Sequence, residues 1–157
     1  MRNSSARRRL RLDEFVPYRL SVLTNTVSSA IAGAYAERFG LSIPEWRVMA
    51  VLALEPGLSA ATVAERTAMD KVAVSRAVSS LLRTRRVARG FANADRRRSV
   101  LRLSTEGEEV YWRVVPFARR YEQSLLADLS ESQRAQLKQL LDHLHARARA
   151  LGPIRPE

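Results

Sequence analysis

Cysteine is absent from this chain of 157 residues, and histidine occurs only as His143 and His145. The absence of cysteine excludes disulfide bonds, a thiolate nucleophile, cysteine-based zinc sites and a thiol redox switch. Two helical residues that are two positions apart point to nearly opposite sides, so His143 and His145 are not expected to chelate one metal ion together. We therefore expect neither a metal nor another cofactor.

Long apolar runs are also absent. No apolar stretch approaches the roughly 18 residues of a membrane span. The first residues, MRNSSARRRLRLDEF, are basic but contain no apolar core of a secretory signal. We therefore expect a protein of the cytoplasm that has no membrane partner.

Acidic residues are scarce beside basic ones, at 16 against 27, which gives a net charge of +11 and a pI near 11.3. The excess is concentrated between residues 66 and 102, which carry a net charge of +9, so the other 120 residues carry only +2. A block of one sign repels itself unless an anion binds it. The distribution favours a polyanionic partner.

Apolar spacing and capping residues predict six helices and one hairpin. The helices are expected at about 17–39, 43–54, 60–66, 71–85, 105–128 and 131–151, and the strands at 87–91 and 99–103 around a basic turn at 92–98. The fold class is thus mainly α with a small β-hairpin wing, a winged helix-turn-helix joined to further helices. We assign residues 1–12 to a flexible basic arm and 41–103 to the DNA-binding domain. The first and last helices have long apolar stripes that so small a chain cannot fully cover, so we assign residues 13–40 and 104–152 to a helical dimerisation domain; the alternative is that they pack only within one chain.

The helix pair at 60–85 and the adjacent basic hairpin suit double-stranded DNA. The major groove admits one helix, and the hairpin then overhangs the neighbouring minor groove, where arginine fits well. The second helix is expected to bury one face and to present small, polar and basic side chains on the other. That exposed face comprises Lys71, Val72, Ser75, Arg76 and Ser79. Arg76 could bind either a guanine edge or a phosphate. The alternative to a DNA-binding role for this face is that it is an ordinary basic helix surface exposed to solvent.

The hairpin tip contains one acid among three arginines. Asp95 is expected to stabilise the wing by binding a neighbouring arginine or capping the turn, so that Arg96 and Arg97 face DNA. The alternative is a solvated turn with a surface ion pair that contributes less than about 1 kcal/mol.

The stretch LSAATVAERTAMDKVAVSRAVSSLLRTRRVARGFANADRRRSVLRLSTEG resembles MarR-type (multiple antibiotic resistance regulator) transcriptional regulators, as does SIPEWRVMAVLALEPGLS before it. The family's hairpin pattern is D-x-R, alternating apolar residues, then L-[ST]-x-x-G. It appears here as Asp95, Arg97, Leu101, Leu103, Ser104 and Gly107. The resemblance covers about residues 13–150.

The resemblance implies a homodimer whose two winged domains reach successive major grooves of a pseudo-palindromic operator. It implies DNA contacts at Ser75 and Arg76, then at Lys71, Val72 and Ser79, with Arg97 and Arg96 in the wing. Many such proteins are repressors that a small, often aromatic anion releases from DNA.

A ligand pocket is expected between the two domains, lined by Tyr18, Arg19, Trp46, Arg47 and Tyr111. Aromatic walls with an arginine suit an aromatic carboxylate or an acyl-thioester. The alternative is that Trp46 and Tyr111 are ordinary core aromatics.

Two other classes of function compete with a sequence-specific repressor. The composition also allows a nucleoid or RNA-binding protein without sequence preference, although such a protein needs no small polar set like Ser75 and Ser79. An enzyme is not expected, because Glu108 beside Glu109, or Asp142 with His145, are ordinary spacings of a helix surface and no glycine-rich phosphate loop is present.

Overall fold

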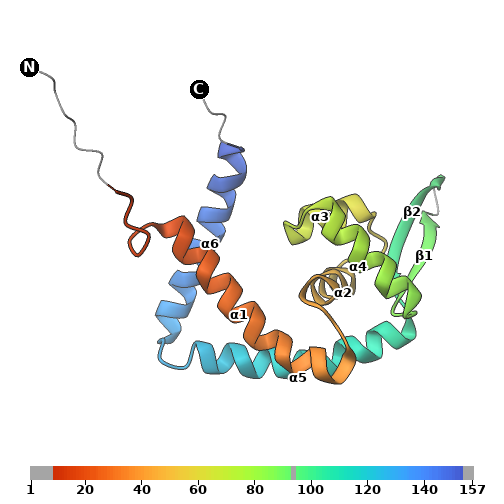
Figure 1. Cartoon of the computed structure of the whole chain (residues 1–157), viewed down its shortest axis with the longest axis horizontal. Helices are drawn as coiled ribbons and strands as arrows, with labels where there is room; N and C mark the ends of the chain where they lie inside the picture. Colours follow the sequence, from red (N-terminus) through yellow and green to blue (C-terminus); the bar gives the residue numbers. More distant parts are fainter. Residues whose placement is uncertain (1–8, 93–94, 154–157) are drawn as a thin grey trace, which may run out of the picture. The chain divides into compact units, whose positions relative to one another are not determined.

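The structure is a computed structural model that describes residues 9–92 and 95–153, without the side chains of residues 92–98. Its elements follow in the order α1 (Val16–Phe39), α2 (Ile43–Leu54), α3 (Ala60–Thr67), α4 (Lys71–Arg83), β1 (Val87–Ala92), β2 (Asp95–Leu103), α5 (Thr105–Leu125) and α6 (Glu131–Leu151) (Figure 1). The predicted mainly helical fold with one hairpin wing is confirmed. The chain forms two compact units, with the boundary after Phe117, inside α5.

Serine side chains begin four of these helices, and at the start of α5 the Ser104 hydroxyl accepts from the Gly107 N–H at 3.0 Å. The Ser42 hydroxyl accepts a hydrogen bond from the Glu45 N–H, and the Glu45 carboxylate accepts one from the Ser42 N–H at 2.7 Å. Ser130 and Gln133 form the same reciprocal pair at the start of α6. Ser59 accepts from the third backbone N–H of α3. Each cap satisfies N–H groups that the first turn of a helix leaves without a partner.

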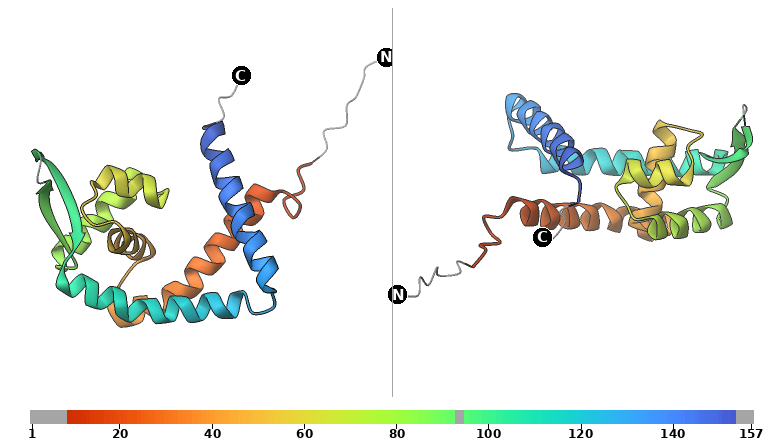
Figure 2. Two further views of the ribbon diagram at one scale, coloured as in Figure 1. Left: turned by 180° about the vertical axis from the view of Figure 1, so that it is seen from behind. Right: turned by 90° about the horizontal axis from the view of Figure 1, so that it is seen from above.

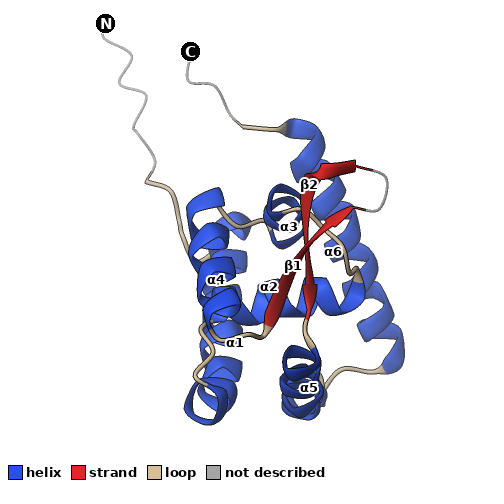
Figure 3. Ribbon diagram, turned by 90° about the vertical axis from the view of Figure 1, so that its right-hand side faces the viewer, coloured by secondary structure: helices blue, strands red, loops and turns tan. Residues whose placement is uncertain are grey.

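The hairpin is an antiparallel pair in which Val87 lies opposite Leu103 and Phe91 lies opposite Ser99. It forms a twisted two-stranded ribbon (Figure 3). Leu101 also donates its N–H to the Leu58 carbonyl at 2.8 Å. The connection between α2 and α3 therefore anchors the base of the wing.

The predicted turn at 92–98 is wrong in its extent. The strands continue to Ala92 and resume at Asp95, with a register shift after Phe91. The prediction took a run of polar and basic residues for a turn. Strand pairing uses backbone groups, however, and a two-stranded ribbon exposes enough surface to accommodate charged side chains.

Helix α4 ends two residues earlier than predicted, at Arg83. The cause lies in Arg85, which adopts a left-handed backbone conformation with φ 58°. An L-residue with a Cβ is strained there, at a cost of about 1 kcal/mol. This conformation turns the chain from α4 into β1.

We expect Arg85→Gly to unfold at a higher urea concentration than Arg85→Ala. Both variants lose the same charge, but only alanine retains the Cβ that crowds the left-handed conformation. The expected difference in the free energy of unfolding is about 1 kcal/mol in favour of glycine. A more stable alanine variant would show that Arg85 does not hold this conformation in solution.

The first unit has one hydrophobic core to which α1, α2, α3, α4, the hairpin and α5 all contribute. Its most deeply buried side chains are Tyr35, Leu41, Val48, Met49, Leu52, Val63, Val74, Leu81, Leu101 and Val114. Helix α4 packs on α2 and α3 and lies beside β1, as the two views of Figure 2 show. The core thereby holds the predicted recognition helix next to the wing.

The second unit consists of the end of α5, a short connection and α6. The Arg134 guanidinium donates to the Leu126 carbonyl at 2.7 Å and to the Leu129 carbonyl at 3.0 Å, which closes the turn before α6. Helix α6 nevertheless leaves its apolar stripe exposed. The exposed residues are Leu137, Leu140, Leu141, Leu144 and Leu151.

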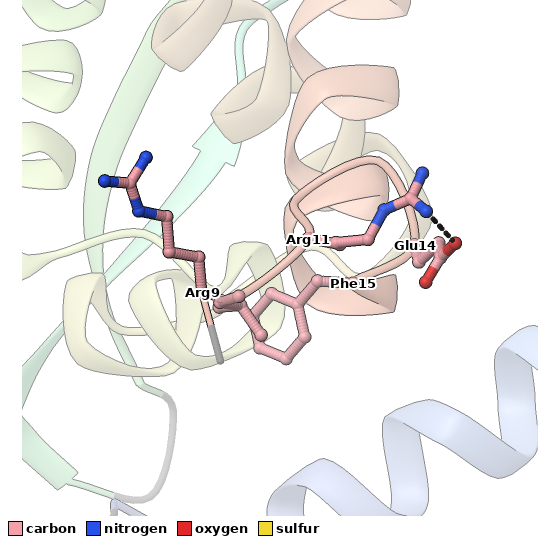
Figure 4. Close-up of a pocket in the computed structure, with 5 residues that line it drawn as sticks. Arg9, Arg11, Glu14 and Phe15 are labelled. Carbon is pink, nitrogen blue, oxygen red and sulfur yellow. Dashed lines mark ion pairs between the residues drawn. The ribbon is translucent and has the colours of Figure 1, made fainter. Parts of the chain in front are cut away.

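Residues 1–8 of the predicted basic arm lie outside the described residues. Further along, Arg11 forms ion pairs with Asp13 at 2.6 Å and with Glu14 at 3.1 Å. The hydrogen bond from Arg11 lowers the pKa of Asp13. Arg9, Arg11, Glu14 and Phe15 line an open hollow of about 410 Å3 just before α1 (Figure 4). All of these side chains are exposed, so the ion pairs contribute little to stability.

No helix in the described part of the chain combines the length and the apolar character needed to cross a lipid bilayer.

Candidate nucleic-acid interface

The helix-turn-helix consists of α3, the turn at residues 68–70, and α4. The turn is closed by Ala68, which adopts a left-handed conformation with φ 51°, and by the Met69 N–H, which donates to the Ala64 carbonyl at 3.2 Å. The Asp70 carboxylate accepts a hydrogen bond from the Ala73 N–H at 2.8 Å. This rare acid of the basic segment therefore caps α4, where a negative charge is favourable.

Helix α4 has two distinct faces. Val74, Ala77, Val78 and Leu81 are buried in the core. The opposite face carries the predicted DNA-contacting residues, and every one of them is exposed: Lys71, Val72, Ser75, Arg76 and Ser79. The 3.6-residue period therefore predicted this surface correctly, including the 59% exposure of the apolar Val72.

One side of this face borders a hollow of about 270 Å3. Lys71, Ser75 and Ser79 line it from α4, Arg89 lines it from β1, and two alanines line it from the start of α3. Arg89 was not among the predicted site residues. The sequence shows that it is basic, but only the packing of β1 against α4 brings it beside Ser75.

Arg76 lies on the other side of α4. It lines a second hollow of about 390 Å3, together with Ser42 and Glu45 from α2 and Ser80 from α4. The two cations Lys71 and Arg76 thus occupy opposite margins of the exposed face. A helix with cations along both margins can place one near each wall of a groove.

The wing contributes the predicted residues Asp95, Arg96 and Arg97. Their side chains lie outside the described residues, so the predicted stabilising role of Asp95 and the predicted DNA contacts stay predictions. The backbone places Asp95 opposite Ala92, at the end of the hairpin remote from its buried Val87–Leu103 pair.

Glu45 is the buried charged residue under α4, with 8% of its surface exposed. Burial alone raises its pKa. Hydrogen bonds from the Ser80 side chain and from the Ser42 N–H and hydroxyl, with the charge of Arg86, outweigh that effect, so the pKa of Glu45 lies below its ordinary value. The ionised carboxylate therefore joins the start of α2 to α4.

We expect Glu45→Gln to lower the free energy of unfolding by about 1 kcal/mol near neutral pH. A lowered pKa in the folded state means that the stabilisation is present above the ordinary pKa of 4.5 and is lost as pH falls through the folded value. The difference between wild type and variant should therefore shrink in acid, as measured by urea unfolding. Glu55→Gln is the control, since half-buried Glu55 pairs with the exposed Arg66 at 3.0 Å. A stability difference between wild type and Glu45→Gln that grows in acid would contradict the conclusion that the ionised Glu45 carboxylate stabilises the fold.

Two of the five predicted ligand-pocket residues, Trp46 and Tyr111, are in contact, and a third, Arg47, acts electrostatically on the neighbouring Tyr35. The Trp46 and Tyr111 rings stack at 5.6 Å, and the Tyr35 ring lies 5.7 Å from Trp46. Arg47 donates to the Ser28 hydroxyl at 3.1 Å. Burial raises the pKa of Tyr35, and the charge of Arg47 opposes that shift.

Tyr18 and Arg19 are not part of this cluster. They lie in the first turn of α1, ten and nine residues before Ser28, which is about 15 Å along a helix. The cluster instead includes Tyr35, which sequence reasoning missed because a tyrosine inside an apolar stripe is indistinguishable from ordinary core. In the described part of the chain no three acidic or histidine side chains gather as a metal site would require.

The helix-turn-helix and most of the wing lie within a segment that is similar to known proteins. The model of the MarR family matches residues 39–98. A solved MarR/EmrR family transcriptional regulator from Acinetobacter sp. ADP1 is 28% identical, covers 88% of this chain and 97% of its own, and superimposes with a TM-score of 0.81. Residues 39–98 thus match the MarR family of transcriptional regulators, and a solved regulator of that family is similar over most of the chain.

Two further solved MarR-type structures are similar. The PcaV transcriptional regulator from Streptomyces coelicolor, solved with its natural ligand, is 26% identical over 88% of this chain and 97% of its own, with a TM-score of 0.74. The S. aureus MepR–DNA complex shares the fold, with 19% identity, 86% and 97% coverage and a TM-score of 0.75. No curated protein matches the chain in sequence.

Proposed function

We propose that this protein is a MarR-type transcriptional regulator, a cytoplasmic homodimer that binds a pseudo-palindromic operator in double-stranded DNA and represses transcription until a small ligand releases it. The observation that carries the proposal is the exposed face of α4, where cations flank small polar side chains. Ser75 and Ser79 suit base edges, Val72 suits a thymine methyl group, and Lys71 suits a phosphate. Arg96 and Arg97 of the wing enter the adjacent minor groove.

The dimer is supported by apolar side chains that the single chain leaves exposed. In α1 these are Val16, Leu20 and Leu23, which border a hollow of about 310 Å3 together with Arg19. In α6 they are the five leucines named above. Exposed apolar stripes of this extent mark interaction surfaces. We assign residues 13–40 and 104–152 to dimerisation and residues 41–103 to DNA binding.

The ligand is proposed to be a small aromatic anion or an aromatic acyl-thioester. The support is the ring cluster of Tyr35, Trp46 and Tyr111, together with the charge of Arg47, which acts on Tyr35. The ligand-bound PcaV structure supports a small-molecule site in a chain of this fold. A thermal-shift screen of aromatic acids and their thioesters tests this part, and stabilisation by none of them would count against it.

The experiment that tests the main proposal is a binding competition at physiological ionic strength. Labelled DNA from the protein's own promoter competes with random DNA of the same length, while analytical ultracentrifugation measures the mass. We expect a dimer that prefers the promoter fragment and whose affinity falls steeply with salt. Equal binding to both DNAs would favour the nucleoid or RNA-binding alternative, and a monomer would contradict the proposed operator symmetry.

A further inference from the structure

Arg86 lies between the end of α4 and the start of β1, half-buried among other elements of the first unit. Its guanidinium Nη2 donates to the Phe39 carbonyl, at the last residue of α1, at 2.5 Å. The final carbonyls of a helix lack partners within the helix and carry partial negative charge, so a cation is favourable there. Arg86 thus joins α1 to the chain that follows α4.

The same guanidinium acts on α2. Its charge attracts the Glu45 carboxylate, which also accepts hydrogen bonds from Ser42 at the start of α2 and from Ser80 in α4. The end of α1 is therefore tied, through the Phe39 carbonyl, to the chain that follows α4, and the start of α2 is tied to α4 through Glu45.

The backbone of Arg86 makes a third connection. Its carbonyl accepts a hydrogen bond from the Ser104 N–H at 3.1 Å. It also lies so close to Gly107 that a Cβ on Gly107 would be 1.9 Å from the carbonyl oxygen. The first turn of α5 consequently rests on this residue.

This arrangement leaves one polar group unsatisfied. The Nε atom of Arg86 is buried and has no hydrogen-bond partner among the described residues. An unsatisfied buried donor is costly, and an aliphatic side chain at this position would avoid that cost. The cost of this donor is one that the hydrogen bond to the Phe39 carbonyl and the attraction to Glu45 must offset.

We infer that Arg86 is a positioning residue of the DNA-binding surface, holding α4 in a defined orientation to α1, α2 and α5 without contacting DNA. The inference rests on the proposed function. It distinguishes Arg86 from exposed cations such as Lys71 and Arg89, which flank the hollow beside α4. Arg86 contributes to affinity by fixing geometry, whereas the exposed cations contribute by contacting phosphates.

The dependence of operator affinity on salt separates the two roles. A cation that contacts a phosphate releases counterions, so its removal lowers the slope of log affinity against log salt by about one per contact. Arg86→Met keeps a long apolar stem but loses the charge. We expect it to lower operator affinity about tenfold, the size of effect expected when coupled residues of one hydrogen-bond network lose a member, and to leave the salt slope unchanged. Arg89→Ala should lower both the operator affinity and the salt slope.

Two further variants complete the test. Arg66→Met removes one exposed arginine of the same unit, which pairs with Glu55 at 3.0 Å, and should lose only the little affinity that a lower net charge costs. Arg86→Lys, which still reaches toward Phe39 and Glu45, should recover most of the affinity lost in Arg86→Met. Thermal unfolding of each variant shows that binding is measured on folded protein.

Wild-type affinity in folded Arg86→Met would overturn the inference. So would a reduced salt slope, because it would make Arg86 a phosphate contact. If Arg86→Met does not fold, Glu45→Gln tests the same network, and unchanged operator affinity in that variant would overturn the inference as well. A wild-type protein that prefers no DNA fragment would instead overturn the proposed function, which the inference presupposes.

Discussion

Replacement of Gly107 by alanine is expected to lower the free energy of unfolding by more than about 3 kcal/mol. The added Cβ would lie 1.9 Å from the carbonyl oxygen of Arg86 and 2.8 Å from its carbonyl carbon. Both neighbours are backbone atoms, so neither can rotate away as a flexible side chain could. Helix α5 would have to move away from the start of β1, breaking the hydrogen bond from the Ser104 N–H to the Arg86 carbonyl. Urea unfolding followed by circular dichroism measures the loss.

Gly33→Ala provides the matched control. Gly33 lies inside α1, and a Cβ built there meets nothing within 4 Å. Alanine is favoured over glycine within a helix by up to about 1 kcal/mol, so this variant should equal or exceed the wild type in stability. Equal stability of Gly107→Ala and Gly33→Ala would show that α5 does not approach Arg86 this closely.

Replacement of Arg76 by alanine is expected to weaken operator binding by about 10- to 100-fold, the range measured for a good contact to a base edge. Arg76 is exposed at the margin of α4, so its loss should leave the folded structure intact. Fluorescence anisotropy with the operator and with scrambled DNA measures the effect. A larger loss for the operator than for scrambled DNA would assign Arg76 to a base, and equal losses would assign it to a phosphate.

Arg66→Ala is the control for this measurement. It removes the same charge from the same unit, but from the end of α3, where Arg66 pairs with Glu55. We expect only the small loss caused by a lower net charge. Operator affinity that is unchanged in Arg76→Ala would remove this residue from the interface and leave Lys71 and Arg89 as its cations.

The helices could be predicted because their ends depend on neighbours in the sequence. Ser42 and Glu45 are three residues apart, and so are Ser130 and Gln133, so each pair can form a capping box wherever the helix later packs. Gly40, with φ 59°, ends α1 for an equally local reason, because glycine adopts the left-handed conformation without strain.

The candidate site could be predicted only in part. The helical period alone separates the exposed Ser75 and Ser79 from the buried Val74 and Val78, because a helix with one apolar face must bury that face. The nearness of Arg89 to Ser75 could not be predicted, since it depends on how a strand packs on a helix. Tyr35, which joins the cluster around Trp46, was missed because a tyrosine inside the apolar stripe of α1 looks like an ordinary core residue.

By itself, the amino-acid sequence determined the order of helices and strands, their caps and the face of α4 that carries positive charge, because these follow from interactions between residues a few positions apart. The tertiary structure alone decided that Arg86 reaches the end of α1, that Gly107 rests on its carbonyl and that Arg89 lies beside Ser75. These contacts join residues up to 47 positions apart, as in the Arg86–Phe39 hydrogen bond, and they form only when packing of the shared core brings their elements together.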